Sequence, residues 1–377
     1  MEPVVVIPDH TPSRRQFMTA PFRSEPAAQQ DEALGQEQEQ VQGDEPSCLI
    51  HVGRRAMACQ FEVIFNQQDR DTATEGAVAA LDLVDDLENQ LSVYRDQSEL
   101  SQLNRVAAAQ ATPVERRLYE LIKLSIELFH ATEGAFDITS TPLSKLWGFY
   151  RRDGRMPPAS DVAVCLAQIG SQHISFDDQH GSVNFLRSSL DINLNGIGKG
   201  YALDRCRQLL VDEGVHDVLI QGGRSSVVAV GRRKGPGAEL PGWKVALRHP
   251  LRPEERIFEF DLVNSALGTS GSATQSFYFQ GRRYGHILDP RTGWPATGVL
   301  SATVLAPEAA LADALSTAFY VMGAEAAVAF CGTRPELVAI LVVPGKRAGS
   351  IEAHTIGIPD DHMRVCAAAP FPVVRHD

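Results

Sequence analysis

The sequence predicts an α+β fold, in which one large domain is built on a mixed, mainly antiparallel sheet with flanking helices. Strand-like segments come in runs of two or three between helical ones, whereas a doubly wound sheet would alternate strands and helices. Of the 377 residues, 44% are hydrophobic, which is enough for a full core. No Pro/Gly/Ser-rich linker interrupts the chain after residue 48, so residues 48–377 are expected to form a single domain.

The first part of the chain differs in composition from the rest. Residues 1–47 are rich in Gln, Glu, Pro and Ala, and their only apolar cluster is Val4 to Ile7. Because such a segment cannot bury enough apolar surface to fold, we expect a disordered acidic tail over 1–47. The formal net charge of the whole chain is −12, and neither the tail nor the remainder is basic, which argues against nucleic acid as the partner.

The periodicity of the apolar residues predicts the elements in order. An apolar run predicts a strand over 61–65, and a stripe at helical spacing predicts a helix over 72–91. The spacing of Thr112, Pro113 and Glu115 is that of a capping box, so the next helix is expected to begin at Thr112. Further helices are predicted over 199–213 and 309–322. Further strands are predicted at 173–176, 183–186, 217–221, 226–230, 243–248, 257–262, 284–288, 299–306 and 337–343.

Three features bear on the compartment. The six cysteines show no CxxC or zinc-like spacing, so a reducing compartment is the simpler interpretation. The stretch SRRQFM at 13–18 resembles a twin-arginine export signal, but no apolar h-region follows it. No apolar run is long enough to cross a bilayer. The sequence is therefore interpreted as that of a cytoplasmic protein without a transmembrane segment.

A glycine-rich segment precedes one of the predicted helices. Glycines at 196, 198 and 200 surround Lys199, and backbone N–H groups at such a helix N-terminus can bind a phosphate. The segment is not a P-loop, because Gly200 follows Lys199 where Ser or Thr is required. It is not the dinucleotide fingerprint, because Tyr201 replaces the third glycine. On these residues alone, an anion site and a tight strand-to-helix turn are equally supported.

Aromatic residues flank an acid in the segment 134–149. Phe136 and Trp147 could stack on a planar ligand, and Asp137 could accept hydrogen bonds from the polar edge of that ligand. Burial in the core is the stronger alternative for aromatic residues beside a loop.

A carboxylate and a hydroxyl lie one turn apart on the helix predicted over 309–322. Asp313 and Thr317 share the face opposite the apolar stripe, so their oxygens are neighbours and could bind a hard cation such as Mg²⁺. The alternative, slightly favoured by spacing alone, is a solvated face in which Thr317 bonds back to a carbonyl. No HExxH or paired-His spacing occurs, so zinc suits the sequence less well than magnesium.

A single histidine ends a predicted hairpin in the segment 266–295. The pattern Thr269 to Gly271 is interpreted as a turn, and the hairpin through Gly281 would bring His286 close to it. The strand over 284–288 would then end in a stiff loop set by Pro290 and Pro295. A lone His in a strand is more often a satisfied core residue than a catalytic base.

The order of these segments is more specific than any one of them. The segments are AMACQFEVIF, SVYRDQSELSQLN, GAFDITSTPLSKLWGF, DINLNGIGKGYALDRC, LIQGGRSSVVAVG, the stretch 269–295 and ADALSTAFYVMG. Together they closely resemble the FAD:protein FMN transferases, the ApbE-like flavin transferase family, over about residues 48–330. The resemblance implies a central FAD cleft. It also implies transfer of FMN from FAD to a Thr or Ser hydroxyl of an acceptor protein, with release of AMP.

The resemblance also implies roles for individual residues. Mg²⁺ would be bound by Asp313, Thr317 and the carbonyl of Gly196. The catalytic residues would be Asp313 and His286, and His286 would be the base for the acceptor hydroxyl. FAD would be held by Met57, Tyr94, Ala135, Phe136, Asp137, Asn193, Lys199, Thr269, Ser270 and Ile287.

Four positions depart from the pattern of that family. Asn193 stands where an Asp is usual, and Ser272 where an Asp or Asn is frequent. Arg224 replaces an acid or amide, and Gly285 replaces a second His. These departures keep two alternatives open: an FAD pyrophosphatase that gives FMN and AMP, and a non-catalytic FAD-binding protein. For the transferase, the expected acceptor carries a Ser/Thr-Gly-Ala/Ser-Thr-like motif and could be a membrane redox subunit.

Overall fold

The computed structural model describes residues 49–235, 242–272, 275–358, 363–366 and 370–376. The acidic tail predicted over 1–47 lies outside this part of the chain. Among the described residues, no helix combines the length and the apolar character needed to cross a membrane.

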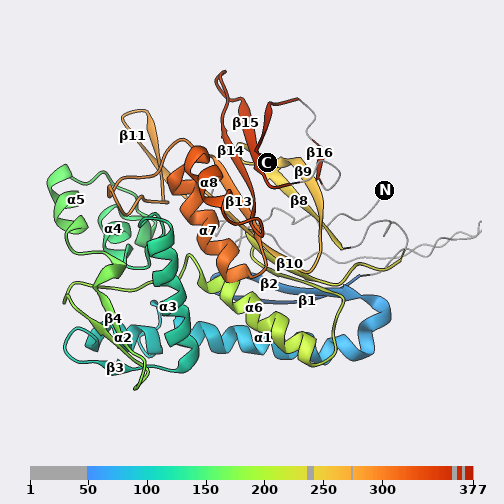
Figure 1. The fold of residues 1–377 in the computed structure, drawn as a ribbon, viewed down its shortest axis with the longest axis horizontal. Helices are drawn as coiled ribbons and strands as arrows, with labels where there is room; N and C mark the ends of the chain where they lie inside the picture. Colours follow the sequence, from blue (N-terminus) through green and yellow to red (C-terminus); the bar gives the residue numbers. More distant parts are fainter. Residues whose placement is uncertain (1–48, 236–241, 273–274, 359–362, 367–369, 377) are drawn as a thin grey trace, which may run out of the picture.

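A nine-stranded sheet runs through the middle of the molecule (Figure 1). All neighbouring strands are antiparallel except the last pair, which is parallel, as the predicted mixed, mainly antiparallel sheet requires. In spatial order the strands are β1 (Leu49–Ala56), β2 (Cys59–Asn66), β6 (Val218–Gly222), β7 (Ser226–Val230), β10 (Ser265–Gly271), β13 (Ser301–Ala306), β14 (Val338–Pro344), β15 (Ile351–Ile356) and β17 (Val373–His376).

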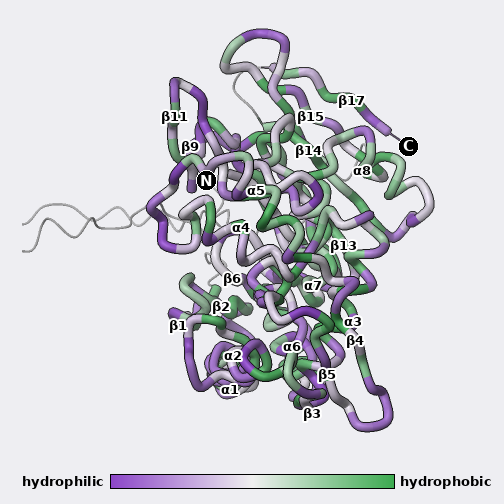
Figure 2. The backbone as a smooth tube through the Cα atoms, turned by 90° about the vertical axis from the view of Figure 1, so that its left-hand side faces the viewer, coloured by the Kyte–Doolittle hydropathy of each residue, from purple (hydrophilic) through white to green (hydrophobic). Residues whose placement is uncertain are grey.

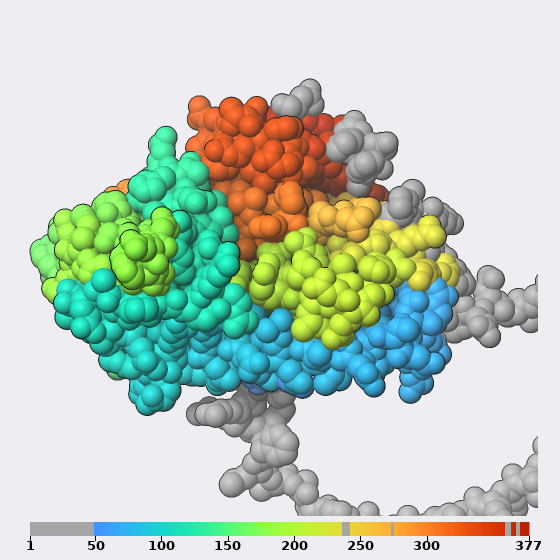
Figure 3. Space-filling view, turned by 60° about the horizontal axis from the view of Figure 1, so that its bottom comes forward, coloured from blue at the N-terminus to red at the C-terminus, as the bar shows by residue number. Residues whose placement is uncertain are grey.

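Helices cover one face of this sheet. They are α1 (Arg70–Leu91), α6 (Gly198–Asp212), α7 (Ala309–Met322) and α8 (Ala324–Cys331), and Figure 3 shows α1, α6 and the α7–α8 segment side by side. Along β2, Val63 and Phe65 pack into the core on the helical side, whereas Ile64 packs on the opposite side. This alternation follows from the two-residue period of a strand. Both faces of the sheet are therefore buried.

A smaller sheet covers the other face. It consists of β8 (Trp243–His249), β9 (Arg252–Leu262) and β16 (Met363–Val365), and it buries Trp243 and Phe258 against the main sheet. Hydrophilic residues gather on the outer loops, and hydrophobic ones run through the interior layers (Figure 2).

A lobe between α2 and β5 lies beside the helical layer, on the left of Figure 1. Its elements are α2 (Glu99–Val106), β3 (Thr112–Pro113), α3 (Arg116–Ala131), α4 (Thr141–Leu146), α5 (Ala159–Leu166), β4 (Ile174–Asp177) and β5 (Ser182–Phe185). Short 3₁₀ turns lie at Phe149–Arg151 and Ser171–His173, and a third, Gln67–Asp69, precedes α1. A two-stranded hairpin, β11 (Ser276–Phe279) and β12 (Arg282–Gly285), projects above the lobe (Figure 1).

Three local predictions were wrong. Thr112 does not cap a helix, because Thr112 and Pro113 pair with β5, and the carboxylate of Glu115 caps α3 instead by accepting the Arg117 N–H. Residues 269–271 form the end of β10 rather than a turn, since they continue the pairing with β13. The strand expected over 284–288 ends at Gly285, so His286 follows the strand.

Candidate active site

A cavity of about 430 Å³ lies where the lobe meets the end of the main sheet. Its walls come from the lobe, from the loop before α6, from β10, from the segment after β12 and from α7. Every residue predicted for the site except Met57 lines it: Tyr94, Ala135, Phe136, Asp137, Asn193, Gly196, Lys199, Thr269, Ser270, His286, Ile287, Asp313 and Thr317. Segments far apart in the sequence therefore meet at one concave surface, which is the usual setting of a ligand site.

Met57 lies apart from this lining. It occupies the turn between β1 and β2 with a φ of 47°, and it packs, half-buried, against the main hydrophobic core. Its predicted contact with the nucleotide therefore has no counterpart in the cavity wall.

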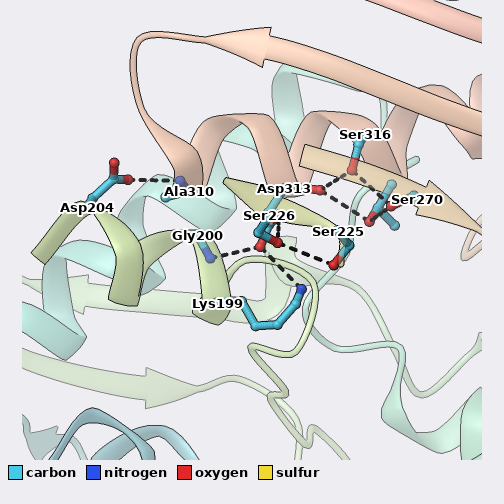
Figure 4. Close-up of polar contacts among 10 residues, drawn as sticks. Lys199, Gly200, Asp204, Ser225, Ser226, Ser270, Ala310, Asp313 and Ser316 are labelled. Carbon is cyan, nitrogen blue, oxygen red and sulfur yellow. Dashed lines mark hydrogen bonds and ion pairs between the residues drawn. The ribbon is translucent and has the colours of Figure 1, made fainter. Parts of the chain in front are cut away.

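The carboxylate of Asp313 is held by groups from two other elements (Figure 4). Ser226 on β7 donates to Oδ1 at 2.6 Å, and the Gly200 N–H on α6 donates to Oδ2 at 2.8 Å. The ammonium of Lys199 lies 3.5 Å from Oδ2. Asp313 is only 5% exposed, so the alternative of a solvated helix face is wrong for this side chain.

Close backbone contact brings α6 and α7 together at this point. A side chain on Gly200 would place a Cβ 2.1 Å from the Ala309 carbonyl oxygen, so only glycine fits. Asp204, one turn further along α6, accepts the N–H groups of Ala309 and Ala310 at 2.9 Å each and so caps α7. Burial raises the pKa of Asp204, and the two N–H groups oppose that shift by stabilising the charged form.

Three hydroxyl groups cluster beside the main-chain carbonyl of Asp313, which accepts from Ser316 and Thr317. Ser270 on β10 lies 2.9 Å from the Ser316 hydroxyl and 3.0 Å from the Thr317 hydroxyl (Oγ to Oγ or Oγ1). Thr317 donates back to the Asp313 carbonyl at 3.3 Å, as the sequence alternative predicted. The atoms around Asp313 that could ligate a metal are therefore almost all oxygens.

This set of donors fits a hard cation. Among the described residues, no three His, Cys, Asp or Glu side chains come together, so a soft-metal cage is absent there. Asp313, Thr317 and Gly196 all line the cavity, and a carboxylate, a hydroxyl and a carbonyl are the ligands that Mg²⁺ accepts. A buried carboxylate at a cavity wall is also the electrostatic feature that favours a bound cation.

Asp137 organises the wall contributed by the lobe. Its Oδ1 accepts the N–H of Thr139 at 2.8 Å, the hydroxyl of Thr139 at 2.7 Å and the hydroxyl of Ser171 at 2.7 Å. Burial raises the pKa of Asp137, and these hydrogen bonds oppose the shift. One carboxylate oxygen is thus engaged in holding the loop, and the residue still lines the cavity.

The two aromatic residues of the 134–149 segment differ in placement. Phe136 is buried, and its ring lies close to Gly196, where an added Cβ would be 3.2 Å from it. Trp147 is fully buried, donates its indole N–H to the Gly293 carbonyl at 2.9 Å and stacks on Tyr284. For Trp147 the core alternative holds, and its bond fixes the stiff loop that follows His286.

His286 faces the cavity with a defined tautomer. Its Nδ1 lies 3.1 Å from the Gln275 carbonyl, which can only accept, so Nδ1 carries the proton and Nε2 has a free lone pair. The Gln275 side chain in turn donates to the Phe149 carbonyl at 2.8 Å. Burial lowers the pKa of His286, so the neutral ring is favoured.

One of the departures from the family pattern lies in the cavity wall. Asn193 lines it and uses Oδ1 to accept the Asn195 N–H at 2.9 Å. Asp191, the nearest acid in the sequence, is instead paired with Lys145 at 2.5 Å and is not part of the lining. Asp191 therefore does not replace the missing carboxylate.

Two features of the site were missed by the sequence reasoning: Tyr150 in the cavity lining, and the buried Ser226 behind it. Tyr150 lies 5.1 Å from Tyr94 between ring centroids, so the two rings form an aromatic pair at the cavity. Ser226, which donates to the Asp313 carboxylate, is the first residue of β7, and all the residues after it in that strand are apolar. A polar residue at the start of such a strand is the only signal that could have pointed to Ser226.

A second cavity, of about 440 Å³, lies beside the first. Its lining residues come from β12, from Asp289, from the loop after Pro290 and from the end of α7, and none of them lines the first cavity. It contains none of the predicted site residues.

Comparison with known proteins finds relatives in one family. The model of the ApbE family matches residues 57–341. An FAD:protein FMN transferase of Klebsiella pneumoniae is 33% identical over 244 residues, covering 63% of this chain and 68% of the relative. One of Vibrio cholerae is 28% identical over 291 residues, covering 76% and 85%. The structure of the Pseudomonas stutzeri flavinyl transferase ApbE aligns with a TM-score of 0.71 at 29% identity, covering 82% of this chain and 95% of that one.

The matched residues extend from the turn before β2 to the middle of β14, and so include every wall of the cavity. On the strength of that match, this chain belongs to the ApbE family.

Proposed function

We propose that this chain is a Mg²⁺-dependent FAD:protein FMN transferase, which moves FMN from FAD to a Ser or Thr hydroxyl of an acceptor protein and releases AMP. The names of its relatives give the reaction class. The observation that carries the proposal is the convergence of Asp313, Lys199 and the free Nε2 of His286 on one cavity.

The diphosphate of FAD would lie at the start of α6. Lys199 supplies a positive charge there, and the helix N-terminus adds its dipole. A Mg²⁺ ion held by Asp313, Thr317 and the Gly196 carbonyl would neutralise the phosphate oxygens on which charge develops. Ser270 lies beside Thr317 and is placed to donate to the same oxygens.

The acceptor hydroxyl would be activated by His286. Nε2 takes the proton as the hydroxyl oxygen attacks the phosphorus of the FMN half, and the bond from that phosphorus to the AMP half breaks. The products are the FMN phosphoester on the acceptor and AMP. The Gln275 carbonyl keeps the ring in the tautomer that this step needs.

The flat rings of FAD would use the aromatic wall. Phe136 and the Tyr94–Tyr150 pair offer faces for stacking, and Asp137 and Asn193 offer hydrogen-bonding groups at the same wall. Ile287, Ala135 and Thr269 complete that surface.

The acceptor and the compartment are also proposals from the sequence. The acceptor would carry a Ser/Thr-Gly-Ala/Ser-Thr-like motif, as on a membrane redox subunit. The compartment proposed from the spacing of the cysteines in the sequence is the reducing cytoplasm.

One incubation separates the transferase from its two alternatives. The protein is mixed with FAD, Mg²⁺ and an acceptor domain that carries the motif, and the products are measured by intact mass and by chromatography of nucleotides. Acceptor that gains one FMN, with one AMP released per label, supports transfer. Free FMN and AMP without labelled acceptor would show a pyrophosphatase, and bound FAD without either product would show a binding protein.

A further inference from the structure

The outer edge of β12 carries main-chain N–H and C=O groups that do not pair with β11 and could pair with a partner. The hairpin is a two-stranded sheet, and the bond from the His286 N–H to the Gln275 carbonyl sets which residues face β11. Because antiparallel pairs alternate, residues 282, 284 and 286 turn their main-chain groups to β11. Arg283 and Gly285 turn theirs to the other side.

The chain itself covers only part of that outer side. Ala296 donates to the Ile287 carbonyl at 2.9 Å, and Asp289 donates to the Trp294 carbonyl at 2.8 Å. The returning segment then diverges at Gly298, whose φ is 94°. Within the described part of the chain, no hydrogen bond reaches the outward main-chain groups of Arg283 and Gly285. An unpaired strand edge of this kind is a template for an added strand.

The second cavity lies along this unpaired edge. Its lining runs from Arg282 to Gly285 on β12 and from Trp294 to Thr297 on the returning segment. Trp294 is 39% exposed, so the groove offers an apolar surface as well as main-chain groups. The groove is about 440 Å³ in volume, enough for a few residues of extended chain.

The groove is also positively charged. Arg282 is exposed, and Arg283 lies next to it in the lining. The one acid of the groove, Asp289, is already paired with Arg291 through both carboxylate oxygens, at 2.9 and 3.0 Å. A neutral or acidic segment therefore fits this groove better than a basic one.

The unpaired edge leads directly to the candidate base. His286 follows Gly285 in the chain, and this segment borders both spaces: Gly285 and Asp289 line the groove, and His286, Ile287 and Leu288 line the cavity. A strand added along Arg283 and Gly285 would end next to His286, where the returning segment begins to pair through Ala296 with Ile287 and through Pro295 with Leu288. One side chain of that strand would then lie at the wall between groove and cavity.

We propose that the acceptor docks here as an extended segment, pairs with the β12 edge at Arg283 and Gly285, and has neutral or acidic residues next to Arg282. The inference rests on the proposed transferase function and names how that reaction recognises its protein substrate. Main-chain pairing gives binding that tolerates different side chains, and the arginines set the charge preference.

A charge-swap experiment tests the recognition. Two peptides with a Ser-Gly-Ala-Thr core, one flanked by Asp and the other by Lys, are compared as acceptors for wild type and Arg282→Glu. Wild type should use the Asp peptide with a KM about tenfold lower, and Arg282→Glu should reverse that order. Rescue of Arg282→Glu by the Lys peptide shows that the variant is folded. Arg70→Glu, an exposed arginine on α1 outside both cavities, should keep the wild-type preference.

A backbone scan tests the pairing itself. The Asp peptide is N-methylated at one residue at a time, which removes one main-chain donor without changing a side chain. Pairing with β12 predicts a rise in KM of about tenfold at alternate residues and little change between them.

The outcomes separate the docking site from the function. Labelled peptides with a reversed charge preference and an alternating scan support the groove. Labelled peptides with no charge preference and a flat scan would overturn the groove and leave the transferase intact. A wild-type dimer in sedimentation that Arg282→Glu dissociates, together with a flat scan, would assign the edge to a second copy and overturn the proposal. Absence of label on any acceptor would overturn both the function and the groove.

Discussion

His286 connects burial, tautomer and reactivity in one side chain. Its Nδ1 donates to the Gln275 carbonyl, and burial lowers its pKa from the ordinary value. Because only the neutral ring accepts a proton, the base is available down to a lower pH than an exposed histidine would be.

The pH dependence of transfer should show this shift. On the acid limb, the midpoint of the pH profile of kcat/KM for the acceptor should lie below pH about 6.5, the ordinary pKa of histidine. The reason is that the ring stays neutral until the pH drops through its lowered pKa. His286→Gln should lower the rate and remove the limb. A wild-type limb above 6.5 would contradict the assignment of His286 as the base.

Ser226 should act through Asp313 rather than on the substrate. Ser226→Ala removes the donor to Oδ1, so the carboxylate loses a fixed orientation and cation binding should weaken by about 10- to 100-fold. The measurement is Mn²⁺ binding by calorimetry without FAD. Ser125→Ala is the matched control, because Ser125 is equally buried but bonds only to the Leu121 carbonyl within α3. Equal Mn²⁺ affinity in the two variants would rule out the role of Ser226.

At this scale, sequence reasoning found most of the residues that line the cavity but not the contacts that hold them in place. The glycines around Lys199 and the spacing of Asp313 and Thr317 each left the functional and the structural interpretations open. The burial of Asp313 against Ser226 and Gly200 excludes a solvated face for this side chain, and that burial depends on how β7, α6 and α7 pack. Contacts between residues about 90 to 110 positions apart leave no periodic signal in the chain.

The joint between α6 and α7 is the element that places the site. It brings Lys199 and Asp313 from two helices to the same point, and Asp204 ties the two helices together by capping α7. Both helices carry their functional residues near this joint, so its geometry sets the geometry of the cavity wall.

Substitution of Gly200 should disturb this joint. Gly200→Ala puts a Cβ 2.1 Å from the Ala309 carbonyl oxygen, and overpacking of this kind costs about 3 kcal/mol. A clear fall in the melting temperature is therefore expected. Gly198→Ala is the control, since the nearest atom to its added Cβ is 4.0 Å away and the melting temperature should not fall. Equal melting temperatures for the two variants would contradict the close packing.

The elements were predictable where their signals are local. The helices expected over 72–91, 199–213 and 309–322 occur as α1, α6 and α7, with ends that differ by two residues or fewer. Local signals failed at Thr112. It has the spacing of a capping residue, but it pairs with Val183 and so belongs to strand β3. The end of β10 was also missed, since its small polar residues are strand residues only by their pairing with β13.

The whole molecule brings a lobe against a sheet, and the cavity lies between them. Both parts contribute walls to the cavity, so FAD and a cation bound there should hold the lobe and the sheet together. A ligand that binds only the folded chain at a hundred times its dissociation constant adds about 2.7 kcal/mol of stability.

Thermal unfolding should therefore respond to both ligands. FAD with Mg²⁺ should raise the melting temperature more than FAD with a chelator, and Mg²⁺ alone should have a smaller effect. Asp313→Ala should lose the part of the shift that depends on Mg²⁺ and keep the part that depends on FAD alone. A Mg²⁺-dependent shift of wild-type size in Asp313→Ala would place the cation elsewhere.

The most direct test of the account is the mass of the acceptor after incubation with FAD over a range of Mg²⁺ concentrations, with wild type and with Asp313→Ala. We expect wild type to add one FMN to each acceptor in a Mg²⁺-dependent manner and Asp313→Ala to add none at any Mg²⁺ concentration. Labelling by Asp313→Ala at the wild-type rate would contradict the central claim that this carboxylate holds the cation for FMN transfer.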